Sequence, residues 1–169
     1  MTNNGLPEQL PGFDDPLGLL RACHNKMLVH CGLLESLPDT PDPAVAQQVL
    51  RYFSTNAVTH HRDEEQDLFP RLNRQSIKLA ELIHRLRQEH TELDRLWATI
   101  AAVLRRPAAA GTDPDFRSTV ALFCALARDH IARENGELLP LAASSLSRAA
   151  LGEIGESMAA RRGVPYSAL

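Results

Sequence analysis

Four stretches of the chain carry apolar residues at helical spacing, and in each stretch at least one histidine falls inside the apolar stripe. The third stretch shows the pattern most simply, because His90 is flanked at helical intervals by leucines and by Trp97. In the second and fourth stretches a glutamate follows a histidine by one turn in the same arc. This pattern indicates helices packed around a polar interior. The inward-facing polar residues are His24, His60, His61, Glu64, His90, His130 and Glu134.

The composition favours helices throughout the chain. There are 26 leucines and 22 alanines against 7 valines and 5 isoleucines, which is a bias toward strong helix formers and away from strands. Prolines beside acidic or small residues mark the ends of the helical segments. We therefore predict an all-α fold with helices over about 16–37, 43–69, 76–105 and 114–139, with ends defined to within ~2–4 residues.

Three of these helices have a recognisable start. Asp42 with Pro43, and Asp113 with Pro114, are each typical of an N-cap followed by proline at the first helical position. Ser76 can cap the third helix in the same way.

Short connections make neighbouring helices antiparallel, so we predict an up-down-up-down four-helix bundle. Pro70 should end or bend the second helix near Phe69. After Pro140 the pattern predicts a shorter fifth amphipathic helix that ends near Gly163. The expected organisation is an irregular arm over 1–15, a bundle over 16–145, and a C-terminal helix and tail over 146–169.

A metal site explains why several polar groups would be buried together. At ~1.5 Å per residue, the polar positions fall within one or two turns of the same height in the bundle. Unpaired charges in an apolar core cost several kcal/mol each, and a cation compensates that cost. The His-x-x-x-Glu pairs, His60 with Glu64 and His130 with Glu134, place both side chains on one helical face.

The residues that follow the two glutamates form an internal repeat. Segment 64–70 reads Glu-Glu-Gln-Asp-Leu-Phe-Pro, and segment 134–140 reads Glu-Asn-Gly-Glu-Leu-Leu-Pro. This match selects Glu64 over the adjacent Glu65, although the two neighbours could be confused.

A polar, hydrogen-bonded core is the alternative to a metal site, since a single buried histidine is more often a core residue than a ligand. His30 and His84 point away from the central stripes and are expected at the surface or flank. Cys31 and Cys124 lie on core faces outside the ligand cluster, and we expect them to be small buried hydrophobes.

Size, charge, hydropathy and cysteine content argue against several other classes of protein. A chain of 169 residues suits a single domain, and a net charge of -3 gives no electrostatic footprint for nucleic acid. No apolar run approaches the ~18 residues that cross a bilayer, and the first residues lack the order of a secretory signal. Three cysteines without a C-x-x-C pair fit a reducing compartment. We therefore expect a cytoplasmic protein with neither a membrane nor a nucleic-acid partner.

The motifs resemble those of the hemerythrin family, specifically bacterial HHE cation-binding domains that are not oxygen carriers. The similarity covers about 17–140. It rests on His24, on His60-His61-Arg62-Asp63-Glu64-Glu65 with Leu68-Phe69-Pro70, on Glu89-His90, and on His130 with Glu134-Asn135.

The resemblance implies a four-helix bundle around two non-haem iron ions with an oxo or hydroxo bridge. It makes His24, His60, His90 and His130 terminal ligands, and Glu64 and Glu134 bridging carboxylates. Zinc and manganese are alternatives, because imidazole and carboxylate suit them too.

Two departures from the oxygen-carrier branch argue against dioxygen storage. That branch has a second histidine one turn before His90, where this chain has Leu86, and an aspartate five residues after the fourth-helix histidine, where Glu134 follows His130 by four. Some non-carrier members place a ligand where His61 stands. Two octahedral irons offer about twelve coordination positions. With His61 bound, the protein ligands and the bridging oxygen would leave about one position open, and without His61 about two.

The leading hypothesis is a di-iron protein that binds or senses dioxygen, peroxide or nitric oxide. The alternatives are an enzyme or iron-delivery protein that acts against peroxide or nitrosative stress, and an interaction module in which the metal is structural and a protein partner binds the ends of the chain. No separate acid-base pair is visible in the sequence, so whether the protein is an enzyme stays open.

Overall fold

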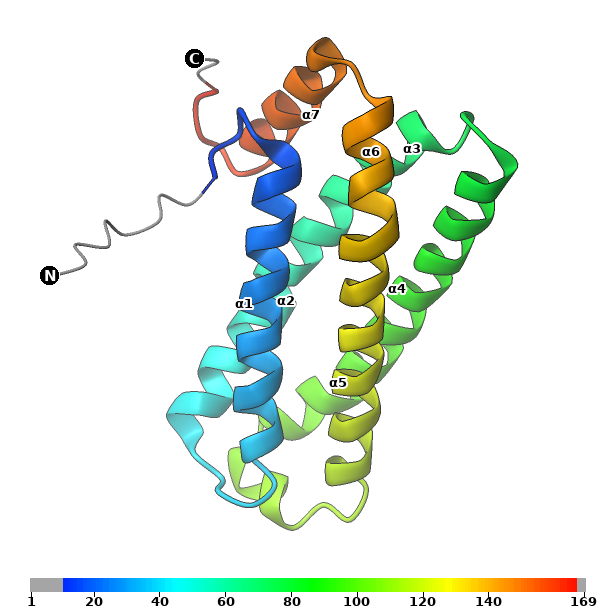
Figure 1. Ribbon diagram of the computed structural model, residues 1–169. Coiled ribbons are helices and arrows are strands. Elements are labelled where there is room, and N and C mark those ends of the chain that lie inside the picture. The colour runs from blue at the N-terminus through cyan, green and yellow to red at the C-terminus, as the bar shows by residue number, and fades with distance from the viewer. Residues whose placement is uncertain (1–10, 167–169) are drawn as a thin grey trace, which may run out of the picture.

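Four long helices run up and down the computed structural model, which describes residues 11–166 (Figure 1). They are α1 (Pro16–Ser36), α2 (Pro43–Asp63), α4 (Ile77–Leu104) and α5 (Phe116–Arg133). α1 and α4 each contact both α2 and α5, so every helix is antiparallel to its neighbours. The predicted all-α bundle is confirmed, and residues 11–166 contain no strand. Over the same residues, no helix has an apolar stretch long enough to cross a membrane.

The second and fourth helices continue past their glutamates. α2 passes through a π-helical turn, η1 (Glu64–Leu68), into α3 (Phe69–Leu72). α5 passes likewise through η3 (Glu134–Leu138) into α6 (Leu139–Ser145). The predicted helix end at 69 lies within the stated margin of Leu72, whereas the predicted end at 139 is too early.

The widened π turns explain why a proline follows each glutamate without ending the helix. In a regular α-helix a proline ring collides with the carbonyl four residues earlier. In η1 the N–H of Phe69 instead donates to the carbonyl of Glu64, five residues back, and in η3 the N–H of Leu139 donates to the carbonyl of Glu134. This bond widens the turn just before each proline. The internal repeat of the sequence thus corresponds to a repeated local structure.

Two of the three predicted helix starts carry the expected cap. Asp42 and Ser76 each accept hydrogen bonds from backbone N–H groups of the first turn that follows them. α5 begins at Phe116, within the stated margin of the predicted start, but the N-cap position belongs to Asp115 and not to Asp113. The carboxylate of Asp113 accepts the N–H of Asp115 at 3.0 Å, which closes a turn before the helix.

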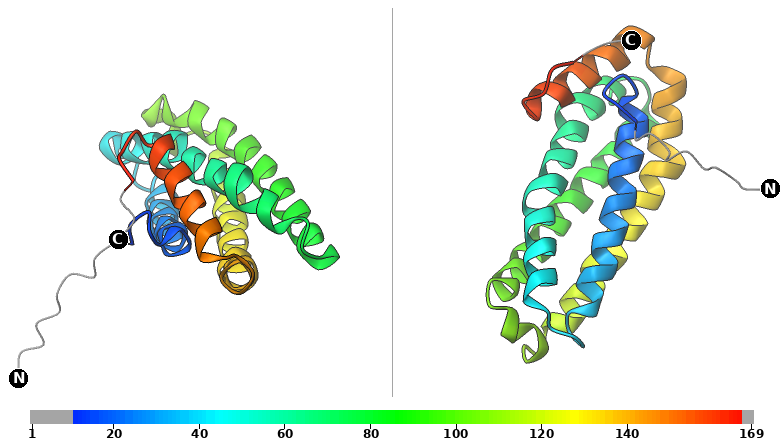
Figure 2. Two further views of the ribbon diagram at one scale, coloured as in Figure 1. Left: turned by 90° about the horizontal axis from the view of Figure 1, so that it is seen from above. Right: turned by 90° about the vertical axis from the view of Figure 1, so that its left-hand side faces the viewer.

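The fifth helix, α7 (Arg148–Arg161), lies across the end of the bundle where α1 begins (Figure 2). It packs Ile154 and Met158 against the long helices, as the predicted C-terminal amphipathic helix should. The connection from α4 to α5 contains a 3-10 turn, η2 (Pro107–Gly111). Residues 1–10 of the predicted arm and 167–169 of the predicted tail lie outside the described residues.

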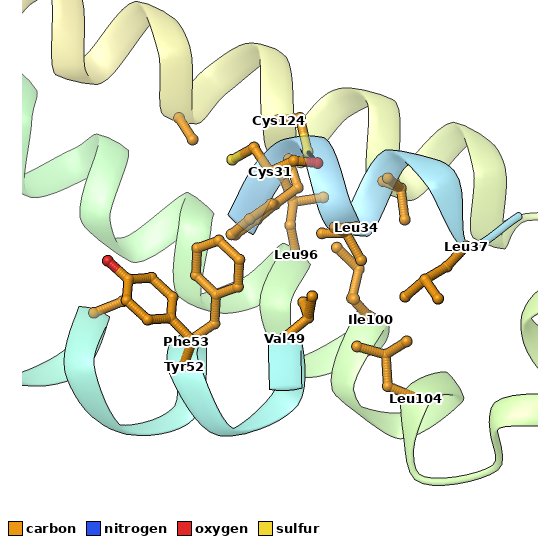
Figure 3. Close-up of a cluster of buried hydrophobic side chains, with 14 of the residues drawn as sticks. Cys31, Leu34, Leu37, Val49, Tyr52, Phe53, Leu96, Ile100, Leu104 and Cys124 are labelled. Atoms are coloured by element: carbon orange, nitrogen blue, oxygen red, sulfur yellow. Dashed lines mark hydrogen bonds between the residues drawn. The ribbon is translucent and has the colours of Figure 1, made fainter. Parts of the chain in front are cut away.

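Two apolar clusters occupy opposite ends of the bundle and leave a polar layer between them. The lower cluster, part of which Figure 3 shows, includes Met27 on α1 and Leu93 on α4. The upper cluster includes Leu20 on α1 and Leu86 on α4. On both helices the inward histidine therefore stands between the two cores.

Candidate metal centre

Six of the predicted side chains meet in this polar layer. They come from all four long helices, and each is at most 2% exposed. The six are His24, His60, Glu64, His90, His130 and Glu134.

The histidines form two pairs, and Glu64 lies between them. The Nε2 atoms of His24 and His60 are 3.1 Å apart, and those of His90 and His130 are also 3.1 Å apart. Oε1 of Glu64 is 3.1 Å from Nε2 of His60, and Oε2 is 3.3 Å from Nε2 of His90. One carboxylate thus presents an oxygen to each pair.

Glu134 repeats this arrangement from the opposite side. Its Oε2 is 3.0 Å from Nε2 of His24, and its Oε1 is 3.1 Å from Nε2 of His130. Each half of the centre therefore combines two imidazole nitrogens with one oxygen from each glutamate. Within each half, the candidate ligand atoms lie within 4.8 Å of one another.

All four carboxylate oxygens of Glu64 and Glu134 lack a hydrogen-bond partner among residues 11–166. The imidazole nitrogens nearby approach them without the geometry of a hydrogen bond. Buried carboxylates in this condition are strongly destabilising unless a cation or a proton compensates their charge. Nitrogen and oxygen donors of these types bind first-row transition metals, so the residues fit a pair of metal ions.

Without a cation, protons would perform the same compensation. Burial acts to lower the pKa of His24 and of His90, but nearby glutamates outweigh it and raise both values to about 9: Glu134 and Glu64 for His24, and Glu64 and Glu65 for His90. Burial conversely acts to raise the pKa of Glu64, and nearby imidazoles, His60 first, keep it well below the usual range. An incoming metal must displace protons from these imidazoles.

Three of the four histidines are oriented by an oxygen at Nδ1. The pairs are His24 with Asn135 at 2.7 Å, His90 with Glu65 at 2.7 Å, and His130 with Glu89 at 2.9 Å. Each oxygen fits as the acceptor of an Nδ1–H, which leaves the Nε2 lone pair directed into the site.

These three orienting residues were not predicted to have a role in the site. Each stands next to a candidate ligand in the chain: Glu65 after Glu64, Asn135 after Glu134, and Glu89 before His90. That adjacency was the available signal. The structure places Glu64 in the inner group and Glu65 outside it.

His61 lies at the edge of the centre. Its half-buried ring stacks on that of His90, with centroids 4.0 Å apart and planes at 19°. One of its nitrogens belongs to a group with His90 and His130, but no such group in the described residues joins it to either glutamate. Burial, followed by the charge of His90, keeps the pKa of His61 well below its usual range, so the ring is neutral.

The remaining polar candidates lie away from the centre, where the sequence placed them. His30 stacks on Tyr52 with centroids 3.7 Å apart, and His84 is exposed. Cys31 and Cys124 are wholly buried in the lower core (Figure 3).

A small apolar cavity lies directly below the polar layer. Its volume is about 30 Å³, which suits a water-sized or diatomic molecule and is far smaller than the pocket of an organic substrate. Each of the four long helices contributes a residue one turn from its histidine, and two of the four are alanines, which leaves the space open. These residues are Met27, Ala57, Leu93 and Ala127. His61 and Asp94 line both this cavity and an adjoining cleft.

Comparison with known proteins agrees with the geometry. The profile of the hemerythrin HHE cation binding domain matches residues 15–142, which include all six residues of the inner group. An uncharacterized protein of Haemophilus influenzae is 31% identical over 166 residues, which cover 94% of this chain and 96% of that protein.

Proposed function

Because the chain belongs to the hemerythrin HHE cation-binding family, we propose that it is a cytoplasmic, non-haem di-iron protein that binds or senses dioxygen, peroxide or nitric oxide. One observation carries the proposal. Glu64 and Glu134 each present one oxygen to each histidine pair, and none of the four oxygens has a hydrogen-bond partner in the described residues.

In this assignment His24 and His60 would hold one iron and His90 and His130 the other, and each glutamate would offer one oxygen to each iron. Two such irons supply redox-active positions that bind small ligands. Two imidazoles, two carboxylate oxygens and a bridging oxygen would leave about one of six octahedral positions open at each metal. His61 is the candidate for one position in the second half.

The surrounding residues favour a small ligand over an organic substrate. The cavity below the site is lined mainly by apolar side chains, and Phe53, Trp97 and Phe123 are among them. A ligand there would contact mainly apolar groups. Asn135, Glu65 and Glu89 hold three imidazoles in place while ligands exchange.

Metal analysis of the purified protein tests the proposal. We expect about two iron ions per chain after anaerobic loading with ferrous iron, in line with a two-metal site. Anomalous scattering at the iron edge should then place both ions in the polar layer. Protein that neither contains iron nor takes it up would refute the proposal, and preferential uptake of zinc or manganese would change the metal.

Ligand addition tests the second half of the proposal. Nitric oxide, peroxide or dioxygen added to the ferrous protein should change its visible spectrum, and His90→Ala should abolish the change. An enzymatic or iron-delivering role is the alternative. Sustained turnover of peroxide that His90→Ala abolishes would favour it over sensing.

A further inference from the structure

Two contacts close the seam between α2 and α4 at separate points. Toward the lower core, the indole N–H of Trp97 donates to the hydroxyl of Ser54 at 3.4 Å. Beside the centre, Glu65, just past the end of α2, lies 2.7 Å from Nδ1 of His90. Along the second helix these contacts are about three turns apart. A passage from solvent into the interior along this seam must therefore lie between them.

Three residues occupy the stretch between the two contacts, and we call them the opening. Val58 and His61 lie there on α2, and Asp94 lies there on α4. All three line the cavity of about 30 Å³ below the centre, and all three also line the adjoining cleft, which has a volume of about 280 Å³. Asp94 is exposed, whereas Val58 and His61 are half-buried. The opening is thus the boundary between the surface cleft and the cavity.

The chemistry of the opening distinguishes neutral molecules from anions. Val58 is apolar and His61 presents an imidazole, so the carboxylate of Asp94 is the one permanent charge among the three. Arg62 lines the cleft but not the cavity, and Glu65 is already paired across the seam. A carboxylate beside an apolar passage repels anions more strongly than it would in water, and it affects neutral molecules little. Since every ion also loses hydration in the apolar cavity, neutral molecules should pass most readily and anions least.

We propose that small neutral molecules reach the metal centre through the opening between α2 and α4, and that Asp94 excludes anions there. The inference rests on the small-ligand function proposed above, to which it adds a route and a selectivity. Dioxygen, nitric oxide and hydrogen peroxide are all neutral in water, whereas azide is an anion of similar size.

The route can be tested without iron, because the single tryptophan of the chain, Trp97, lines the cavity. Dioxygen quenches indole fluorescence on collision. In protein with no added iron, Val58→Phe should narrow the opening and lower the quenching constant of dioxygen about twofold, since close-packed interiors have few other voids. Val29→Phe, at an exposed position of α1, is the matched control. An unchanged constant in Val58→Phe would overturn the route.

The selectivity is tested on the iron-loaded protein by stopped-flow mixing. At low ionic strength, Asp94→Asn should bind azide to the ferric protein about fivefold faster than the wild type, and this gain should shrink at about 1 M salt. Binding of nitric oxide to the ferrous protein should be unchanged. Val58→Phe should slow both ligands about tenfold while the iron stays bound. Asp129→Asn, an exposed change on α5 that lines neither space, is the control.

The outcomes separate the opening from the metal site. Equal azide rates in Asp94→Asn and the wild type, or an equal gain for nitric oxide, would overturn the exclusion of anions by Asp94. Unchanged nitric oxide binding in Val58→Phe would overturn the route. Wild-type protein that takes up no iron, or whose iron binds neither ligand, would instead refute the proposed function, and the fluorescence of Trp97 would still decide the route.

Discussion

Adjacent glutamates of the second helix have different partners and different roles. Glu64 directs both oxygens into the centre, whereas Glu65 lies against the outer nitrogen of His90 at 2.7 Å. The internal repeat of the sequence was enough to separate them, because Asn135 takes the place of Glu65 in the second copy and an amide is a poor substitute for a bridging carboxylate. Which imidazole each orienting oxygen contacts was not predictable, because these contacts join different helices.

Glu64→Gln should therefore abolish binding of both metals, because it removes a negative charge and an oxygen shared by the two halves. Glu65→Gln keeps an oxygen acceptor for His90 and should lower metal affinity by about tenfold at most. Metal content after dialysis against a buffered chelator measures both effects. Glu81→Gln, an exposed change on α4, is the control. Equal loss from Glu64→Gln and Glu65→Gln would contradict the bridging assignment.

The buried imidazoles also predict how the stability of the metal-free protein depends on pH. The pKa values of His24 and His90 are raised to about 9 in the folded protein, above the unfolded value of 6.5. The stability that their protons contribute is complete below pH 6.5 and is lost as the pH rises through 9. Calorimetry of the metal-free protein should therefore show a falling Tm over this interval. In the metal-loaded protein the metal replaces these protons, so a fall of equal size there would contradict the interpretation.

At the scale of the helix, the π turns are the feature that the sequence did not predict. Pro70 suggests an end or a bend of the helix, whereas the hydrogen bond from Phe69 to Glu64 and the following α3 show that the helix continues. Energetic preferences of single residues favour termination, while packing of Phe69 and Leu72 into the upper core favours continuation. The end of a helix at a proline is therefore decided by tertiary contacts, which local sequence patterns do not contain.

Helical register also explains the cavity below the centre, because Ala57 and Ala127 precede their ligand histidines by one turn. Ala127→Leu should fill the space and slow ligand binding by about tenfold or more, while the iron stays bound. Overpacking should cost about 1–3 kcal/mol of stability. Stopped-flow mixing of the ferrous protein with nitric oxide measures the rate. Ala125→Leu, at an exposed position of α5, is the control, and an unchanged rate in Ala127→Leu would show that the ligand enters elsewhere.

At the scale of the whole molecule, the C-terminal helix is joined to the helix that carries Glu64. Arg161 and Arg162 both bond the carboxylate of Asp63, with Nη2 of Arg162 at 2.7 Å from Oδ2. Arg161 also bonds Asp67 at 2.8 Å. The amphipathic pattern of α7 predicted the helix, but these ion pairs join residues too far apart in the sequence for a local pattern to predict them.

Asp63→Asn tests how far this contact stabilises the fold. Asp63 is 1% exposed, so the substitution leaves two arginines facing a neutral, buried amide. We expect a loss of about 2–3 kcal/mol, below the full value for a buried pair because the arginines are partly in water. Urea unfolding of the metal-loaded protein measures it. Glu153, which also lies on α7, is an exposed partner of Arg71 on α3. Glu153→Gln should therefore change the stability by about 0.5 kcal/mol or less. If the two variants lost equal stability, α7 would be held by its apolar contacts through Ile154 and Met158 and not by the arginines.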